Sequence, residues 1–296
     1  MIKYGVIGAG KMGQNHIRNL KEIEGIDLIG YYDPISKLSL KRYEDMMDLI
    51  KESDALSIVT PTSLHYETAL KCLGKDIFIE KPLSTNIDEC KDLKEKFKNN
   101  KLMVGQIERF SPVVQEIKKR IDEDELLSIE IHRCSPYDKR VEVSVIDDLM
   151  IHDIDLLFNY FSPSPIKTMS STTKDVFSNE DYCQVIGEQE NGVNFAITAS
   201  RITQKKIRKI CAHCKNSYIE GDLFNGTVKV DEQATAKEND EIRYENTSRE
   251  AKIILMNNLK KELENFRDCI TYNQEPITNV DEAIKNMNMI KKIKNR

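Results

Sequence analysis

Short apolar runs alternate with amphipathic stretches along roughly the first hundred residues of the chain. Such runs, bounded by glycine, proline or polar residues, are typical of strands that are buried on both faces. The predicted strands are Ile2–Ile7, Ile26–Tyr32, Ala55–Thr60, Asp76–Glu80 and Leu102–Val104. Helical periodicity fills the intervals between them, as in Lys11–Glu24, Ser63–Leu73 and Ile87–Phe97. Strands that alternate with helices predict a parallel sheet with helices on both of its faces.

The pattern changes at about residue 106. A predicted helix at Pro112–Ile121 leads to an alternating strand at Leu127–Cys134. After a second helical stretch, strand-like runs follow one another at Ile166–Thr172, Tyr182–Glu188, Phe195–Arg201, Lys206–Cys211, Ser217–Glu220 and Gly226–Val230. Successive strands without helices between them indicate an antiparallel sheet. The polar stretch Glu232–Arg249 is predicted to be an exposed excursion, and Lys252–Cys269 and Val280–Ile293 are predicted helices.

The first strand ends in a glycine-rich turn, Gly8-Ala9-Gly10-Lys11-Met12-Gly13, which opens the first helix. A strand, such a turn and a helix are the context that a dinucleotide-binding fingerprint requires. Gly8 permits the tight turn, Gly10 lets the backbone approach a pyrophosphate, and Gly13 allows close packing of helix on strand. The helix N-terminus would offer N–H groups and partial positive charge to the phosphates. The turn therefore predicts a dinucleotide cofactor.

The second strand ends at Asp33, twenty residues after Gly13. A carboxylate at this position would accept hydrogen bonds from the ribose hydroxyls of an adenosine and would repel a 2′-phosphate. Pro34 follows, with no arginine beside it. We therefore expect NAD rather than NADP, although an ordinary Asp-Pro turn is the alternative interpretation of these two residues.

Two more segments follow the carboxyl ends of predicted parallel strands, where ligands bind in sheets of this kind. They are Thr60-Pro61-Thr62 and Glu80-Lys81-Pro82. Lys81 ends an apolar strand and precedes a proline, which confines its backbone to extended geometry. We expect this lysine to point across the cofactor crevice; the alternative is a surface lysine in a turn.

These patterns together predict an α/β protein with two domains. Residues 1–105 would form a Rossmann parallel sheet that binds the dinucleotide. Residues 106–296 would form an α+β domain with a mostly antiparallel open sheet, which binds the substrate. The boundary rests on the change of pattern alone, because the chain has no low-complexity linker there.

The stretch Asp148–Asp155 concentrates ionisable groups beside strongly apolar residues. Asp148 and His152 are four residues apart, so on a helix they share one face. A carboxylate beside an imidazole raises its basicity and fixes its tautomer, which makes the pair a candidate acid/base device. A capped core helix is the alternative, since the neighbouring residues are apolar. Asp155 is expected to be a structural hydrogen-bonding partner.

Composition narrows the class further. The chain has 296 residues, a formal net charge of -5 and a pI of about 5.7, which disfavours a nucleic-acid binder. No apolar run has the length of a membrane span. Seven cysteines at irregular spacing suit reduced thiols in a cytoplasm. Cys211-Ala212-His213-Cys214 lacks a second half at zinc-like spacing, so no metal site is expected.

The ordered set of motifs resembles the Gfo/Idh/MocA oxidoreductases over essentially the whole chain. The motifs are Gly8-x-Gly10-x-x-Gly13, Asp33, Thr60-Pro61-Thr62-Ser63-Leu64-His65, Glu80-Lys81-Pro82 and Asp148-x-x-x-His152-Asp153-x-Asp155. The chain departs from the family between Asp33 and Tyr43, where much of the helix that normally borders the adenine pocket is missing.

The resemblance implies roles for individual residues. Lys81, Asp148 and His152 would be the catalytic set, with His152 as the base and Lys81 orienting the hydroxyl, or with these two roles exchanged. The implied cofactor-binding residues are Gly8, Gly10, Lys11, Met12, Gly13, Asp33, Thr60, Thr62, His65, Glu80 and Lys81. The implied substrate-binding residues are Lys81, Arg109, Tyr137, Asp148 and His152, with Arg133, Lys139 and Arg140 as further candidates by location.

Within the family, Val104–Pro112 and Asp147–Asp155 look most like members that oxidise UDP-N-acetylglucosamine at its 3-hydroxyl, for surface polysaccharides or glycoproteins. The resemblance also implies a homodimer or homotetramer, in which the open sheet often mediates oligomer contacts. Two other functions stay open. One is a related dehydrogenase of inositol or a free hexose, and the other is a non-catalytic dinucleotide-binding sensor.

Overall fold

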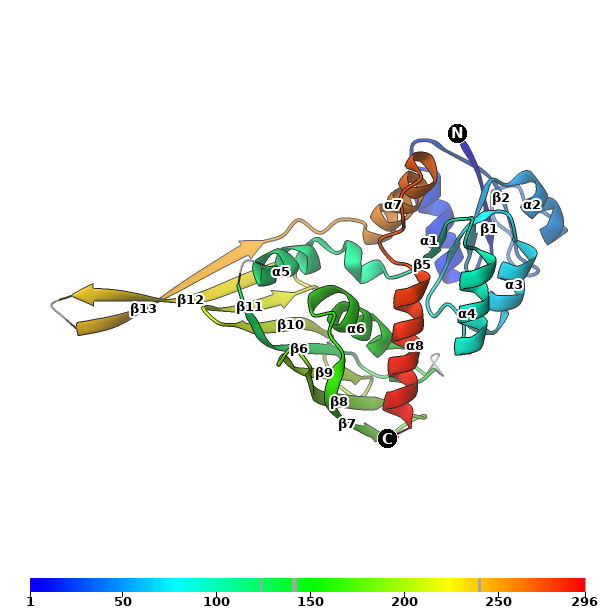
Figure 1. Ribbon diagram of the computed structural model, residues 1–296. Coiled ribbons are helices and arrows are strands. Elements are labelled where there is room, and N and C mark those ends of the chain that lie inside the picture. The colour runs from blue at the N-terminus through cyan, green and yellow to red at the C-terminus, as the bar shows by residue number, and fades with distance from the viewer. Residues whose placement is uncertain (123, 140–142, 239–240, 296) are drawn as a thin grey trace. The chain divides into compact units, whose positions relative to one another are not determined.

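The computed structural model describes residues 1–122, 124–139, 143–238 and 241–295. The chain divides into two compact units (Figure 1). Unit 1 comprises Met1–Ile107 and Asn257–Asn288, and unit 2 comprises Glu108–Met256 and Met289–Arg296.

Unit 1 is built on a five-stranded parallel sheet in the order β2-β1-β3-β4-β5. The strands are β1 (Ile2–Ile7), β2 (Ile26–Tyr32), β3 (Ala55–Ile58), β4 (Asp76–Ile79) and β5 (Leu102–Val104). Val6, Leu56 and Phe78 are completely buried, as expected for strands covered by helices on both faces. The strand order reverses between β1 and β3, so the carboxyl ends of these two strands border the crevice where such sheets bind ligands.

The helices of unit 1 follow the predicted alternation with the strands. They are α1 (Lys11–Leu20), α2 (Met46–Glu52), a 3₁₀ turn η1 (Thr62–Leu64), α3 (His65–Lys71), α4 (Ile87–Lys96), α7 (Asn258–Tyr272) and the first part of α8 (Val280–Lys294). Between β2 and α2 the chain forms no helix. The expected loss of the helix after Asp33 is therefore confirmed.

Two late helices join unit 1, which differs from the predicted division at residue 105. α7 lies beside α1 (Figure 1). Val104 of β5 exchanges two hydrogen bonds with Thr278, one from the Thr278 hydroxyl (2.7 Å) and one to the Thr278 carbonyl (3.2 Å). The backbone N–H of Gln106 donates to the buried Glu262 carboxylate at 2.6 Å. These contacts join residues far apart in the sequence, so no local pattern indicates them.

Unit 2 contains an eight-stranded sheet in the order β13-β12-β11-β10-β6-β9-β8-β7. The strands are β6 (Leu126–Cys134), β7 (Ile166–Lys174), β8 (Tyr182–Gln189), β9 (Asn194–Ser200), β10 (Ile207–Cys214), β11 (Ser217–Asp222), β12 (Thr227–Glu238) and β13 (Glu241–Lys252). Every neighbouring pair is antiparallel except β6 and β9. This arrangement confirms the mostly antiparallel sheet.

One face of this sheet is covered by helical segments: η2 (Ile107–Phe110), α5 (Pro112–Asp122), and the continuous helical stretch formed by η3 (Ile146–Met150), α6 (Ile151–Asp155) and η4 (Leu156–Phe161). Alternate strand residues such as Ile131, Ile197 and Ile210 are buried toward them, whereas His132 and Lys209 are partly exposed. η3 and η4 are π-helical turns, which the sequence pattern did not indicate.

The predicted exposed excursion over Glu232–Arg249 lies in two strands, which the sequence pattern did not indicate. β12 and β13 form one long antiparallel ribbon, and only the first half of β12 also pairs with β11 (Figure 1). A two-stranded ribbon needs no apolar alternation. For that reason its sequence reads as polar although the two strands pair along their length.

Candidate active site

The glycine turn after β1 has the local geometry of a phosphate-binding loop. Gly8 has a φ of +95°, and a Cβ there would lie 2.6 Å from the Val59 carbonyl oxygen. A Cβ on Gly13 would overlap the carbonyl oxygen of Gly8, so α1 can pack on the turn only because Gly13 has no side chain. A Cβ on Gly10, by contrast, would meet no heavy atom within 4 Å. Gly10 therefore borders open space, which a pyrophosphate could fill.

The N-terminus of α1 faces that space, and no side chain caps its backbone N–H groups. Gly10 provides no side-chain cap, and no acidic residue lies in the first turn. The backbone N–H groups of this turn, together with the helix dipole, can hold an anion. Lys11 is exposed and Met12 half-exposed at the same end.

Asp33 follows β2, and its carboxylate is engaged by the loop itself. Oδ2 accepts a hydrogen bond of 2.7 Å from the N–H of Ala9, and Oδ1 accepts from Ile35 and Ser36. Burial raises the pKa of Asp33, but the hydrogen bonds from Ser36, Ala9 and Ile35 outweigh it and lower the pKa below its ordinary value. The carboxylate is thus ionised at neutral pH and fixed beside the glycine turn.

The threonine and histidine after β3 are joined to the strand end that carries Lys81. His65 is 1% exposed. Its Nδ1 lies 2.8 Å from the Pro82 carbonyl oxygen and its Nε2 lies 2.9 Å from the Thr60 carbonyl oxygen. Burial lowers the pKa of His65 and outweighs these two contacts. His65 therefore braces the Lys81–Pro82 segment, while Thr62, in η1, is half-exposed nearby.

Within the described part of the structure, the Thr60 hydroxyl is buried and makes no hydrogen bond. An unsatisfied buried hydroxyl is costly, so a ligand that bonds it there is expected. Together with the open space at Gly10 and the uncapped end of α1, this hydroxyl fits a dinucleotide. Glu80 bonds to His16, which the sequence did not single out; the Nε2–Oε1 distance is 2.8 Å.

In unit 2, Asp148 lines a pocket of about 520 Å³. Its other lining residues are Ser135, Pro136, Tyr137, Asp138, Lys139, Leu149, Arg201 and Lys206. Arg201 donates a hydrogen bond of 2.7 Å to Asp148 Oδ2, and its side chain is only 3% exposed. The Tyr137 ring packs against Phe177 at a centroid distance of 4.3 Å. The structure therefore brings Tyr137 and Asp148 to one pocket and adds Arg201, which no sequence motif marked.

His152 lies on α6, four residues after Asp148, and is half-buried. The apolar residues around it, such as Ile151 and Ile154, are buried and anchor the helix. Asp148 lies on the π-helical turn η3, which continues directly into α6.

Arg109 does not have the geometry expected of a substrate ligand. Its side chain is 4% exposed and makes two hydrogen bonds to Asp155, from Nε (2.7 Å) and from Nη2 (2.9 Å). Arg133 is likewise buried between Asp153 and Glu108. Both guanidinium groups are committed to carboxylates that hold the helix in place, as was expected for Asp155. Arg140, the remaining candidate by location, lies outside the described residues.

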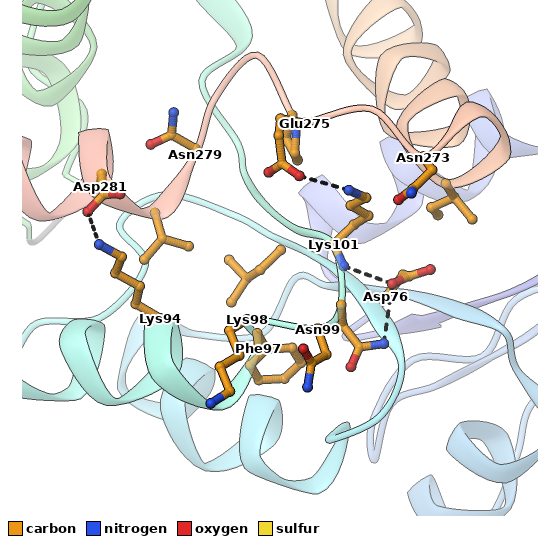
Figure 2. Close-up of a pocket in the computed structure, with 15 residues that line it drawn as sticks. Asp76, Lys94, Phe97, Lys98, Asn99, Lys101, Asn273, Glu275, Asn279 and Asp281 are labelled. Carbon is orange, nitrogen blue, oxygen red and sulfur yellow. Dashed lines mark hydrogen bonds and ion pairs between the residues drawn. The ribbon is translucent and has the colours of Figure 1, made fainter.

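Another pocket, of about 490 Å³, lies in unit 1 at the amino ends of strands β4 and β5 (Figure 2). Asp76 begins β4 and Leu102 begins β5, whereas the nucleotide crevice lies at their carboxyl ends. Its lysines Lys94 and Lys101 are paired with Asp281 (2.7 Å) and Glu275 (2.9 Å) (Figure 2). This pocket is not part of the dinucleotide site.

Other site classes find no support in the described residues. No cluster of histidine, cysteine and acidic side chains there could hold a metal ion. All seven cysteines lie in the described part and are free thiols. No described helix is long and apolar enough to cross a bilayer.

The parallel sheet, the glycine turn and the fixed carboxylate at the end of β2 define a dinucleotide-binding protein with a Rossmann-type unit. Comparison with known proteins agrees. Residues 2–107 match the model of an oxidoreductase family, Gfo/Idh/MocA, with an NAD-binding Rossmann fold, as the resemblance implied.

Curated relatives match most of the chain. The UDP-N-acetylglucosamine 3-dehydrogenase of Acidithiobacillus ferrooxidans is 27% identical over 77% of this chain and 76% of that protein. The scyllo-inositol 2-dehydrogenase (NAD(+)) of Bacillus subtilis is 26% identical over 96% of this chain and 90% of that protein.

Solved structures share the fold over nearly the whole length. The A. ferrooxidans enzyme GnnA superposes with a TM-score of 0.86 at 23% identity, covering 99% of this chain and 96% of that one. The scyllo-inositol dehydrogenase of Lactobacillus casei, solved with NAD(H) and scyllo-inositol, gives a TM-score of 0.81 at 16% identity, covering 100% and 96%.

Proposed function

We propose that the protein is a sugar dehydrogenase that converts UDP-N-acetylglucosamine to its 3-keto form with NAD⁺ as oxidant. The observation that carries this proposal is the pocket beside Asp148. It combines a carboxylate that can grip a sugar hydroxyl with an aromatic ring, Tyr137, and the cations of Lys139 and Lys206. Its volume of about 520 Å³ lies within the usual range for small-molecule sites. Cations near a carboxylate suit a ligand that joins a diphosphate to a sugar.

NAD⁺, held by Gly8–Gly13, Asp33 and Thr60, supplies the hydride acceptor. His152 takes the proton of the reacting hydroxyl as general base, and such positioned proton transfer contributes typically about 10²–10⁴-fold. Asp148 bonds the sugar and stabilises the charged imidazole. Lys81 orients the hydroxyl at the strand end, and an exchange of roles between Lys81 and His152 is the variant of this mechanism that mutagenesis must separate.

A polyol such as inositol is the second candidate substrate. The observation in its favour is the B. subtilis relative, whose match covers 96% of this chain. A polyol needs no diphosphate site, so Lys139 and Lys206 would then contact only solvent. The non-catalytic sensor is not retained, because residues 2–107 match the model of an oxidoreductase family and the relatives described above are dehydrogenases.

The test is a substrate panel. The purified protein is incubated with NAD⁺ and with UDP-sugars, free hexoses or inositols, and NADH formation is followed by absorbance. Reduction of NAD⁺ by UDP-N-acetylglucosamine supports the proposal, whereas reduction by a polyol alone overturns it. If the protein holds NADH tightly, a single turnover gives little absorbance change. Each reaction is therefore also quenched, and its sugar is analysed for a keto product. Light scattering tests the homodimer or homotetramer that belongs to the same proposal.

A further inference from the structure

A chain of buried polar side chains runs beneath the strand end that carries Lys81. The Tyr4 hydroxyl on β1 lies 2.9 Å from Ser57 Oγ on β3, and Ser57 Oγ lies 3.2 Å from His16 Nδ1 on α1. His16 Nε2 in turn lies 2.8 Å from Glu80 Oε1. Tyr4, Ser57 and His16 are at most 1% exposed. Burying connected polar groups is costly unless each of them is hydrogen-bonded. Each donor in this network therefore needs an acceptor.

Only one direction of donation satisfies all of them. Burial raises the pKa of Tyr4 far above its ordinary value, so its hydroxyl keeps its proton and donates to Ser57. Ser57 then donates to His16 Nδ1, and the proton on Nε2 points at Glu80, which can only accept. A proton on His16 Nδ1 would make Ser57 Oγ the acceptor of both neighbours and leave the Ser57 proton without an acceptor among these groups. The network therefore fixes His16 as the neutral Nε2–H tautomer.

Glu80, which accepts the proton of His16, directly precedes Lys81. A second buried histidine, His65, contacts Pro82, which directly follows Lys81. His16 bonds the side chain of residue 80, and His65 contacts the carbonyl of residue 82 at 2.8 Å. The Glu80 carboxylate also fills the space beside Gly105, where a Cβ would lie 3.1 Å from Oε2. Lys81 is thus held between two positions that buried imidazoles fix.

We propose that His16 is a positioning residue of the reaction, which keeps the Glu80 carboxylate ionised and fixed and thereby aims Lys81. The inference rests on the proposed function in that it takes Lys81 as a site residue. A neutral or turned Glu80 would lose both the bond from His16 and its attraction for the Lys81 ammonium. His16 itself touches neither cofactor nor substrate.

The charges around Glu80 give this role a pH signature. The titratable groups that face it are His16 on α1, Lys81 on its own strand end and His65 on α3. Burial raises the pKa of Glu80, but the hydrogen bond from His16 and the charge of Lys81 outweigh burial and lower it. Without His16 the burial cost dominates, and the pKa of Glu80 rises. Burial lowers the pKa of His65.

The experiment compares His16→Leu, which removes the donor, with His16→Gln, whose amide can still donate to Glu80. His213→Leu, an exposed histidine on β10, is the matched control. Turnover is measured from pH 6 to 9 on the substrate that the wild type oxidises. We expect His16→Leu to lose about tenfold at pH 7 and to recover to within about twofold at pH 9, as Glu80 ionises. His16→Gln should retain most of the activity and a flat profile.

A second readout uses the protein without cofactor or substrate. Melting temperatures of the wild type and of each variant are compared from pH 5 to 8. A raised Glu80 pKa destabilises the folded state increasingly as pH rises above the unfolded value, so the deficit of His16→Leu should shrink as pH falls. Glu80→Gln should abolish this pH dependence in the double variant. If His16→Leu does not fold, His16→Gln with and without Glu80→Gln carries the same comparison.

A loss of turnover that is equal at all pH values, equal losses in His16→Leu and His16→Gln, or a pH-independent melting deficit would each overturn the inference. If the wild type oxidises no member of the substrate panel, the proposed function fails. The melting series would still decide whether His16 holds Glu80 ionised.

Discussion

Arg201 donates a hydrogen bond of 2.7 Å to Asp148, although the two residues are 53 positions apart in the chain. The arginine side chain is 3% exposed and the aspartate 38%, so a buried cation holds a carboxylate that solvent and ligands can reach. The Asp148 side chain is thereby fixed in one direction before any sugar binds. Pre-organisation of this kind is what allows a site residue to act without a reordering cost.

Replacing Arg201 should therefore impair catalysis by displacing Asp148. We expect Arg201→Leu to lower kcat about 100-fold, the size of effect known for a misplacement of about 1 Å. Arg201→Lys, which keeps the charge but not the planar fork, should fall between. The exposed Arg249→Leu is the control, and steady-state kinetics is the measurement. Equal kcat in Arg201→Leu and the control would contradict the role.

Lys81 and His152 can be tested separately from cofactor binding. Lys81→Ala and His152→Ala should each lower turnover at least about 100-fold, since each removes a group that handles the reacting proton. The affinity for NAD⁺, measured by calorimetry, should stay within a few-fold for His152→Ala. Near-normal turnover in both variants would refute the catalytic set.

The glycine turn offers a matched pair of alanine substitutions. Gly13→Ala should destabilise the fold, because its Cβ would overlap the Gly8 carbonyl, and its melting temperature should drop by several degrees. Gly10→Ala meets no protein atom and should melt like the wild type, yet it should weaken NAD⁺ binding about tenfold or more by occupying the phosphate space. Undiminished NAD⁺ affinity in a folded Gly10→Ala would place the pyrophosphate elsewhere.

Asp33 should govern the choice between NAD and NADP. Hydrogen bonds keep its pKa below the ordinary value, so the carboxylate is charged at all pH values above about 5 and its repulsion of a 2′-phosphate is constant there. Asp33→Asn should lower the NAD/NADP ratio of kcat/KM at least about tenfold. The ratio in the wild type should start to fall only as pH drops toward the lowered pKa. Ser36→Ala, which removes a nearby hydroxyl without altering charge, is the control.

The pair of Arg109 and Asp155 should affect stability far more than catalysis. Arg109→Met leaves a buried carboxylate uncompensated and should lower the free energy of unfolding by about 3–5 kcal/mol. The double variant Arg109→Met/Asp155→Leu should recover much of that loss. Urea denaturation gives the free energies. If instead Arg109→Met left stability intact and raised only the KM for a nucleotide sugar, the original expectation of a substrate ligand would be restored.

The parallel sheet of unit 1 was predictable because its strands are largely buried on both faces, which leaves short, mostly apolar runs such as Ile2–Ile7 and Ala55–Ile58. The glycine turn was predictable for a similar reason, because its backbone demands glycine at fixed positions. The ribbon of β12 and β13 was not, since its polar sequence carries no periodic apolar signal. The placement of α7 depends on tertiary contacts that no sequence window contains.

The candidate site likewise contains some residues that the sequence could indicate and others that it could not. Lys81, Asp148 and His152 stand in recognisable local motifs and stay predictions until they are mutated. His16 and Arg201 were missed because their roles depend on residues far away in the sequence. His16 bonds to Glu80, 64 positions away, and Arg201 bonds to Asp148, 53 positions away. The sequence could not indicate the pairing of Arg109 with Asp155, because a guanidinium that pairs inside the fold looks in sequence like one that awaits a phosphate.

The missing helix after β2 has a consequence for how this enzyme could evolve or be redesigned. In the absence of that helix, Asp33 orders the segment, since its two carboxylate oxygens accept hydrogen bonds from the backbone N–H groups of Ala9, Ile35 and Ser36. A substitution that admits a 2′-phosphate therefore also removes the acceptors that order the segment after the strand. Cofactor preference and local folding are coupled through one side chain, so a switch to NADP should require a second, compensating change in residues 34–42.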